Sequence, residues 1–180
     1  DYSAHTSSAT VVLTALGGTD GYNGTATGIS GNFANINILV GSAGSDMLTG
    51  PNSGATFNLT GSKAGNVNGV LTFTAIENLV GGTGADSFVF ADNVNFNGTL
   101  NGGAGVDLLD YSAFSAPNPV TANLGANTAT GTTGASNFEN VTGGAGNDTL
   151  TGSAGDNIIK GNAGTDTLTG GAGADTFIFE

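Results

Sequence analysis

The sequence predicts an all-β protein, a parallel β-roll or β-solenoid with glycine-rich turns, and three observations support this prediction. Glycine contributes 33 of the 180 residues, whereas proline contributes only 3. Hydrophobic residues make up 38% of the chain. This is too apolar for a disordered linker and too glycine-rich for helices, which lose roughly 1 kcal/mol for each glycine relative to alanine. A nine-residue pattern also runs without a gap through residues 143–178.

The repeated unit places each residue type at a fixed position. Its four copies begin at Gly143, Gly152, Gly161 and Gly170, and they read GGAGNDTLT, GSAGDNIIK, GNAGTDTLT and GGAGADTFI. Glycine at the first and fourth places lets the backbone turn tightly, with its carbonyl oxygens directed into the turn. The sixth place holds Asp or Asn, and the apolar eighth place should point inward from a short strand. Such a turn offers about half of the six to eight oxygens that calcium requires, so a second turn must supply the rest.

This pattern resembles the RTX calcium-binding nonapeptide repeat. The resemblance implies a β-roll in which successive copies form alternate sides of a flattened coil, and turns two copies apart share a calcium ion. The turn at 143–148 is then expected to pair with 161–166, and the turn at 152–157 with 170–175. One turn departs from the pattern, because Asn157 stands at the sixth place and Asp156 one place earlier. We expect that site to be weaker, since a neutral amide replaces a charge.

Three earlier turns fit the same pattern, at 41–46, 81–86 and 102–107. We therefore expect several Ca²⁺ ions. The expected side-chain ligands are Asp46, Asp86, Asp107, Asp148, Asp156, Asn157, Asp166 and Asp175. The expected carbonyl ligands belong to Gly41, Gly44, Gly81, Gly84, Gly102, Gly105, Gly143, Gly146, Gly152, Gly155, Gly161, Gly164, Gly170 and Gly173. A generic acidic surface would scatter its aspartates, whereas six of the eleven here occupy a sixth place.

The charge balance and the missing residue types exclude several function classes. Fourteen acidic residues stand against two lysines and no arginine, which gives a formal net charge of −12 and argues against nucleic-acid binding. The chain has no cysteine, and His5 is its only histidine. Asp107 and Asp110 could in principle form a glycosidase pair, but their repeat context favours metal binding or turn formation. We expect no enzymatic activity, no catalytic residue and no membrane insertion.

A longer repeat overlies the short one. The sequence Asp-Tyr-Ser-Ala at 1–4 recurs at 110–113, and each copy leads into a glycine turn, at 41 and at 143. We expect residues 1–142 to form a solenoid with rungs of about 20 residues and interspersed calcium turns, with a degenerate turn at 61–66. Residues 143–180 should form a regular β-roll that continues the same solenoid. Because the sequence starts at Asp1, we also expect it to be part of a longer polypeptide.

The strands should be short and rich in Val, Ile, Leu, Phe and Thr. They are expected at 11–16, 24–29, 36–40, 56–60, 70–74, 87–90, 119–124, 128–131, 148–151, 157–160, 166–169 and 175–179. No segment shows a helical period.

Three hypotheses for function remain. The first is a calcium-binding structural module of a large secreted bacterial surface protein, such as an adhesin, S-layer component or filament, which folds on calcium outside the cell. Such a module should self-associate end to end or continue into further repeats, with a cell-surface or glycan partner as an alternative. The second is a folding and secretion appendage of a secreted protease or lipase. The third is a threonine-faced solenoid that binds ice or a glycan. Each hypothesis implies an extracellular location.

Overall fold

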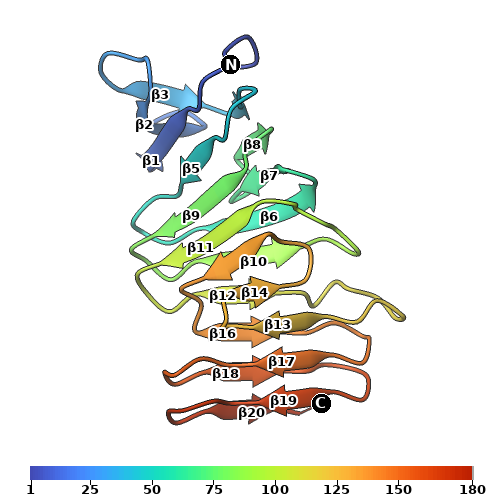
Figure 1. The fold of residues 1–180 in the computed structure, drawn as a ribbon. Helices are drawn as coiled ribbons and strands as arrows, with labels where there is room; N and C mark the ends of the chain where they lie inside the picture. Colours follow the sequence, from blue (N-terminus) through green and yellow to red (C-terminus); the bar gives the residue numbers. More distant parts are fainter. Residues whose placement is uncertain (180) are drawn as a thin grey trace.

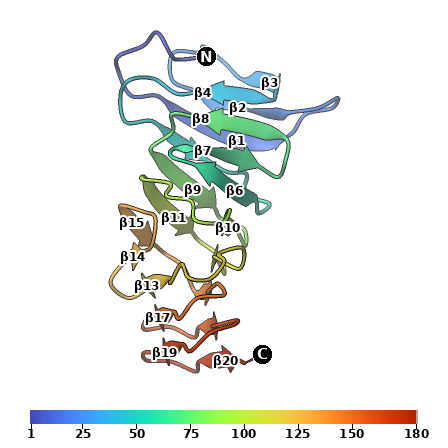
Figure 2. The same ribbon diagram turned by 90° about the vertical axis from the view of Figure 1, so that its right-hand side faces the viewer.

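The computed structural model describes residues 1–179 as a stack of short strands, with the N-terminus at one end and the C-terminus at the other (Figures 1 and 2). All elements of the described residues are strands, arranged in three sheets. The chain passes repeatedly between two sides of a flattened coil, so that strands adjacent in a sheet come from successive rungs. The predicted all-β fold, with many short parallel strands, is confirmed.

One side of the coil is sheet B, whose nine strands follow the spatial order β20-β18-β16-β12-β10-β6-β7-β8-β4. The first six are parallel to one another, whereas β7 is antiparallel to both of its neighbours. The bounds are β4 Ile38–Val40, β6 Thr56–Gly61, β7 Ala64–Val67, β8 Leu71–Thr74, β10 Ser87–Phe90, β12 Leu108–Asp110, β16 Asn140–Thr142, β18 Ile158–Lys160 and β20 Thr176–Ile178.

The opposite side consists of two shorter sheets. Sheet A follows the order β15-β11-β9-β5-β1-β2-β3, and sheet C follows β14-β13-β17-β19. Sheet A contains β1 Thr10–Leu16, β2 Tyr22–Ala26, β3 Phe33–Ile36, β5 Met47–Thr49, β9 Asn78–Gly82, β11 Thr99–Gly103 and β15 Gly134–Ser136. Sheet C contains β13 Thr121–Asn123, β14 Thr128–Ala129, β17 Thr149–Thr151 and β19 Thr167–Thr169.

The spacing between paired strands separates two regions of the coil. In the C-terminal region Thr149 lies beside Thr167 and Ile158 lies beside Thr176, so each rung has the expected 18 residues. Further toward the N-terminus, Ser87 lies beside Leu108, a step of 21. Other steps are much longer than the expected 20, such as the 37 residues from Thr10 to Met47. The long rungs carry antiparallel hairpins (β1–β2–β3, β6–β7–β8 and β13–β14), which lengthen the chain without adding a turn of the coil.

The degenerate turn expected at 61–66 does not form a turn of the solenoid. These residues join β6 to β7 as a hairpin, in which Gly61 pairs with Ala64 and Lys63 takes a positive φ of 54°. Asn58 and Asn66 on the two strands are joined by a side-chain hydrogen bond of 2.8 Å. The segment has glycine at the first place, but Ala64 stands at the fourth, where the repeat needs glycine, and the chain folds back on itself here. Several short strands outside the predicted set also form, including β5, β9, β11 and β12.

The core is a single column of side chains between the two sides of the coil. Its aromatic part runs through the middle rungs, where Phe57 stacks on Phe88 with ring centroids 4.6 Å apart. Phe90 stacks in the same way on Tyr111, at 4.3 Å. Toward the C-terminus the column narrows to the eighth-place residues Leu150 and Ile159, both fully buried. Each rung covers the apolar residue of the one before it, so no single rung could bury its own side chain.

Candidate metal centre

In many rungs an acidic residue directly precedes a parallel strand, and the residues at this position line up in rows from one rung to the next. We call these rows the B column (Ala55, Asp86, Asp107, Glu139, Asn157 and Asp175), the A column (Ala9, Asp46 and Glu77) and the C column (Val120, Asp148 and Asp166). The sixth-place residues Asp46, Asp86, Asp107, Asp148 and Asn157 are at most 1% exposed. Asp166 and Asp175 are half-buried, because they lie on the last rungs.

Hydrogen bonds link successive members of the B column. The N–H of Ala55 donates to Asp86 Oδ1 at 2.6 Å, and the N–H of Asp86 donates to Asp107 Oδ1 at 2.8 Å. The N–H of Asp107 donates to Glu139 Oε2 at 2.8 Å. Further along, the N–H of Asn157 donates to Asp175 Oδ1 at 3.0 Å. Each acid therefore uses one carboxylate oxygen to join its rung to the rung before it.

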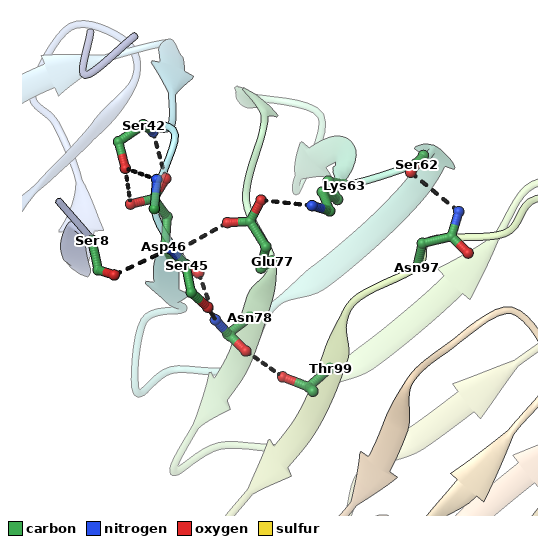
Figure 3. Close-up of polar contacts among 11 residues, drawn as sticks. Ser8, Ser42, Ser45, Asp46, Ser62, Lys63, Glu77, Asn78, Asn97 and Thr99 are labelled. Atoms are coloured by element: carbon green, nitrogen blue, oxygen red, sulfur yellow. Dashed lines mark hydrogen bonds and ion pairs between the residues drawn. The ribbon is translucent and has the colours of Figure 1, made fainter. Parts of the chain in front are cut away.

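The other two columns repeat this arrangement. In the A column, Asp46 Oδ1 accepts from the N–H of Ala9 at 2.6 Å, and Glu77 Oε2 accepts from the N–H of Asp46 at 2.8 Å. Figure 3 shows this pair together with Lys63, whose Nζ lies 3.0 Å from Glu77 Oε1. In the C column, Asp148 Oδ1 accepts from Val120 and Asp166 Oδ1 accepts from Asp148. The turns at 143–148 and 161–166 are thus stacked as expected.

The second carboxylate oxygen faces the first-place glycine of the same turn. A Cβ added to Gly143 would lie 2.2 Å from Asp148 Oδ2 and 2.8 Å from the carbonyl oxygen of Gly161 in the stacked turn. At Gly152 the equivalent neighbours are Asn157 Oδ1 and the carbonyl oxygen of Gly170. Only glycine leaves room here, and the space is lined by a side-chain oxygen and a carbonyl oxygen of the next rung. Most fourth-place glycines instead stack on neighbouring backbone, as Gly164 does on Gly146, whereas a Cβ on Gly155 would meet no backbone atom.

These residues fit a calcium ion. No three acidic or histidine side chains gather at one point among the described residues. A cation would instead be held by one carboxylate and by backbone carbonyls from two turns, which is a donor set suited to calcium. The Oδ2 atoms of Asp86 and Asp107 are buried and have no hydrogen-bond partner. An ionised oxygen left without a partner in the interior is costly, so a bound cation would remove a penalty that the protein alone leaves in place.

Burial also shifts the ionisation of these acids. It raises the pKa of Asp86 to about 6, with a smaller contribution from the nearby Asp107 carboxylate, although the N–H of Ala55 acts in the opposite direction. Burial likewise raises the pKa of Asp107 and that of Asp148, with smaller contributions from Glu139 and Asp166 respectively. A raised pKa means that the charged form is disfavoured unless a cation compensates it.

We expect the stability of the calcium-free protein to depend on pH in a direction opposite to that of the calcium-loaded protein. The folded-state pKa of Asp86 lies above its value in the unfolded chain. Its contribution to stability is therefore complete below about pH 4 and is lost as the pH rises through about 6. With calcium bound, protons compete with the ion, and acid should weaken the fold. In metal-depleted buffer the β signal in circular dichroism should be larger at pH 4.5 than at pH 7, whereas in calcium-containing buffer the temperature of thermal unfolding should be lower at pH 4.5. Equal pH trends in the two buffers would contradict the expectation.

In the turn at 152–157, the structure places the two candidate ligands, Asn157 and Asp156, in different environments. Asn157 lies in the buried column, where its Nδ2 donates to the carbonyl oxygen of Glu139 at 2.6 Å. Asp156 lies on the exposed side of the turn, where its Oδ1 accepts from the N–H of Ala174 at 2.7 Å. Asn157 therefore takes the place of the acid, whereas Asp156 points away from the space beside Gly152.

Replacing Asn157 with aspartate should make this turn more dependent on calcium. In Asn157→Asp the amide donor to the Glu139 carbonyl is lost and two oxygens face each other, which should cost about 1–3 kcal/mol without calcium. With calcium, the added charge should tighten binding at the turn. Denaturant unfolding at a low calcium concentration that still keeps the wild-type chain folded, and at a saturating concentration, measures the two effects, with Asp156→Asn as the exposed control. A variant that is equally stable in both buffers would contradict the expectation.

The sequence prediction did not include two acids of these columns, Glu77 and Glu139. Neither belongs to a glycine turn, because Ala75 and Asn137 with positive φ make the bend instead. A signal was nevertheless present in the sequence. Each glutamate lies two residues before a buried apolar residue, Leu79 or Val141, which is the spacing between the sixth and eighth places of the repeat.

Comparison with known proteins agrees with this geometry. The family model of the RTX calcium-binding nonapeptide repeat matches the chain in four copies, over residues 33–50 and 142–177. No curated protein matches the chain. The described residues contain no helix long and apolar enough to cross a membrane. RTX repeats bind Ca²⁺ and are typical of extracellular proteins exported by type I secretion. With turns that stack in register over buried carboxylates, this chain therefore contains four copies of the RTX calcium-binding nonapeptide repeat, at residues 33–50 and 142–177.

Proposed function

We propose that the module is a structural part of a large secreted bacterial surface protein, and that it folds when it meets calcium outside the cell. The supporting observation is the column of buried carboxylates, whose second oxygens face carbonyls of the next rung. The formal net charge of −12 opposes compaction until cations neutralise it. Calcium is scarce in the cytosol and abundant outside, so ion binding would supply folding free energy only after export.

A calcium titration followed by circular dichroism tests this proposal. The metal-depleted chain at pH 7 should show little β signal and should gain it as calcium is added. Magnesium at the same concentration is the control, because it demands a tighter octahedral shell and keeps its waters. A spectrum that is unchanged by chelator would overturn the proposal. An upstream catalytic domain in the same polypeptide would instead favour the role of a folding and secretion appendage.

We further propose that copies of the module stack end to end, and internal comparison supports this. The sequence at 81–90, GGTGADSFVF, nearly repeats at 170–179 as GGAGADTFIF. In the first copy the next rung covers both phenylalanines, so Phe88 and Phe90 are fully buried. In the second copy Phe179 is 81% exposed. Phe90 is covered by Tyr111, which belongs to the sequence Asp-Tyr-Ser-Ala. The same four residues at the N-terminal end of another copy contain Tyr2, which could cover Phe179 in the same way.

Sedimentation velocity in calcium tests the stacking. The wild-type chain should form species larger than a monomer that grow with concentration, whereas Phe179→Glu should remain monomeric with the same dichroism spectrum. Ile158→Glu, on an exposed side of the coil, is the control for a surface charge. A wild-type monomer at all concentrations in calcium would contradict end-to-end assembly.

A second candidate function has one specific observation behind it. Threonines align across three parallel strands of sheet C, where Thr121, Thr149 and Thr167 are neighbours and all are exposed. Thr151 and Thr169 form a second, parallel row. Such a flat array could bind ice or a glycan. Thermal hysteresis and glycan-array binding, each compared with Thr149→Tyr, test this; equal signals from both proteins would remove the candidate.

A further inference from the structure

Residues 1–49 and 110–151 are two copies of one structural unit. Each begins with Asp-Tyr-Ser-Ala and ends in a glycine turn followed by a strand, β5 in the first copy and β17 in the second. Each also contains a hairpin, β1–β2 or β13–β14, in which one threonine N–H donates to another threonine hydroxyl: Thr10 to Thr27 and Thr121 to Thr130. The two copies can therefore be compared position by position.

Further hydrogen bonds show that the two copies fold alike. Three bonds are present in both: the hydroxyls of Tyr2 and Tyr111 donate to the carbonyl oxygens of Thr27 and Thr130, the N–H groups of Tyr2 and Tyr111 to those of Val40 and Thr142, and the N–H groups of Ser3 and Ser112 to the carboxylates of Asp1 and Asp110. Asn35 and Asn137 make the corresponding bend, with φ of 56° and 55°. Strand β4, Ile38–Val40, therefore corresponds to β16, Asn140–Thr142.

In the second copy, one rung covers the strands at the front of the unit. Residues 99–110 form β11 and β12, which lie on the two sides of the coil. β11 pairs in parallel with β15, and β12 pairs in parallel with β16. The N–H of Asn140 donates to the carbonyl oxygen of Asp107 at 3.0 Å. Leu109, which is fully buried, is paired with Val141. This rung runs directly into the Asp-Tyr-Ser-Ala sequence of the second copy.

In the first copy, the corresponding strands are open. β3 and β4 are the last strands of sheets A and B at the N-terminal end, so neither has a neighbouring strand on its outer side (Figure 2). Ile38, the counterpart of Asn140, is 70% exposed. A cavity of about 80 Å³ opens at this end, and Tyr2, Leu13 and Leu39 are among the mostly apolar residues that line it. Because Leu39 is the counterpart of Val141, the cavity lies where the second copy holds Leu109.

We infer that the N-terminal end of the coil is an acceptor site for one further rung, which runs parallel to β3 and β4 and leads directly into Asp1. Segment 99–109, TLNGGAGVDLL, defines the chemistry of this rung. It is a glycine turn whose acid offers its carbonyl oxygen to the N–H of Ile38, followed by two apolar residues. The second apolar residue enters the cavity over Leu39.

The position of Asp1 decides between this occupant and a strand of a second copy. The bond from Tyr2 N–H to the Val40 carbonyl holds Asp1 beside the end of β4, where Asp110 lies beside the end of β16. A strand from elsewhere could pair along β4 only by displacing Asp1, whereas a rung joined to Asp1 pairs without a clash. The inference deepens the proposed stacking and rests on it only in part. A preceding copy would place Phe179 on Tyr2 next to the added rung, as Phe90 lies on Tyr111.

Adding the rung to the full chain tests the inference. The peptide TLNGGAGVDLL is joined directly to Asp1, and amide hydrogen exchange is measured in calcium. The N–H of Ile38 should exchange at least about tenfold more slowly than in the unextended chain, because it gains a carbonyl acceptor. The temperature of unfolding should rise as well. The matched control carries the same extension with aspartate as its last residue, which cannot enter an apolar cavity. In this control, Ile38 should exchange as it does in the unextended chain.

Equal exchange at Ile38 in all three proteins would overturn the inference. Protection of Ile38 that rises with the concentration of the unextended chain would assign the edge to a second copy, and would overturn it too. Should the extended chain fail to fold by circular dichroism, TLNGGAGVDLL is added to the unextended chain as a free peptide, and unchanged exchange at Ile38 then decides against the acceptor site. A wild-type chain that is unaffected by chelator, or that stays monomeric in calcium, overturns the proposed function and leaves the exchange result standing.

Discussion

Removing calcium is expected to abolish the fold at neutral pH. Each ion that binds only the folded chain contributes about 2.7 kcal/mol at a hundredfold excess over its Kd. The free energy of unfolding of a domain is only about 5–15 kcal/mol, and the loss of two to five ions removes about 5–14 kcal/mol, which is comparable with it. Five pairs of segments present a side-chain oxygen and a carbonyl to the same space: 41–46 with 75–77, 81–86 with 102–107, 102–107 with 137–139, 143–148 with 161–166, and 152–157 with 170–175.

Denaturant unfolding at a series of free calcium concentrations measures this effect. The free energy of unfolding should rise by about 1.4 kcal/mol for each bound ion per tenfold increase in calcium, so the slope reports how many ions are released. We expect a slope that corresponds to the release of more than one ion. An equal free energy of unfolding with calcium and with chelator would refute the expectation. Substituting potassium at equal ionic strength separates specific binding from general screening of the −12 charge.

A single methyl group at the first place of a turn should be nearly as disruptive. In Gly152→Ala the new Cβ would lie 2.2 Å from the carbonyl oxygen of Gly170 and 2.4 Å from Asn157 Oδ1. The carbonyl belongs to backbone, so the stacked turns must move apart. We expect a loss of about 3 kcal/mol, at the upper end for overpacking, together with loss of the ion between these turns.

The same turn supplies a matched control for that variant. Gly155, at the fourth place, has φ outside the left-handed region, and a Cβ there would come no nearer than 3.8 Å to another atom. Gly155→Ala should be neutral or stabilise the fold by up to about 1 kcal/mol, because it restricts the unfolded chain. Thermal and denaturant unfolding in calcium compare the two variants. Equal stability would show that the first-place glycines are not needed for the close approach of the turns.

The repeat made the C-terminal region predictable down to its register. A fixed nine-residue period leaves only one way to stack Leu150 on Leu168 and Ile159 on Phe177, and the structure has both pairs. The same rule placed the acids of 81–86 and 102–107 in a column, since their apolar residues Phe88 and Leu109 follow at the same offset and are paired.

The hairpins and the glutamates were harder to predict. A strand such as β7, Ala64–Val67, contains glycine and asparagine and gains its stability from neighbours on both sides, which local preference does not reveal. The rung length therefore varies wherever a hairpin is inserted. The repeat pattern does not include Glu77 and Glu139, because no glycine turn precedes them and Ala75 and Asn137 make the bend with a positive φ of their own. Their position before the strand, and not the turn sequence, defines membership of the column.

Within the buried columns, the hydrogen bonds from backbone N–H groups to carboxylates all point in one direction along the coil. A backbone N–H on one rung donates to a carboxylate on the rung that follows it in sequence, as Asp148 does to Asp166. The two faces of the stack are consequently not alike: the columns begin at Ala9, Ala55 and Val120, which have no carboxylate, and they end at the acids Asp166 and Asp175. In the proposed stack, modules would meet head to tail, and a head-to-tail contact that does not close on itself generates an open fibre with a defined polarity.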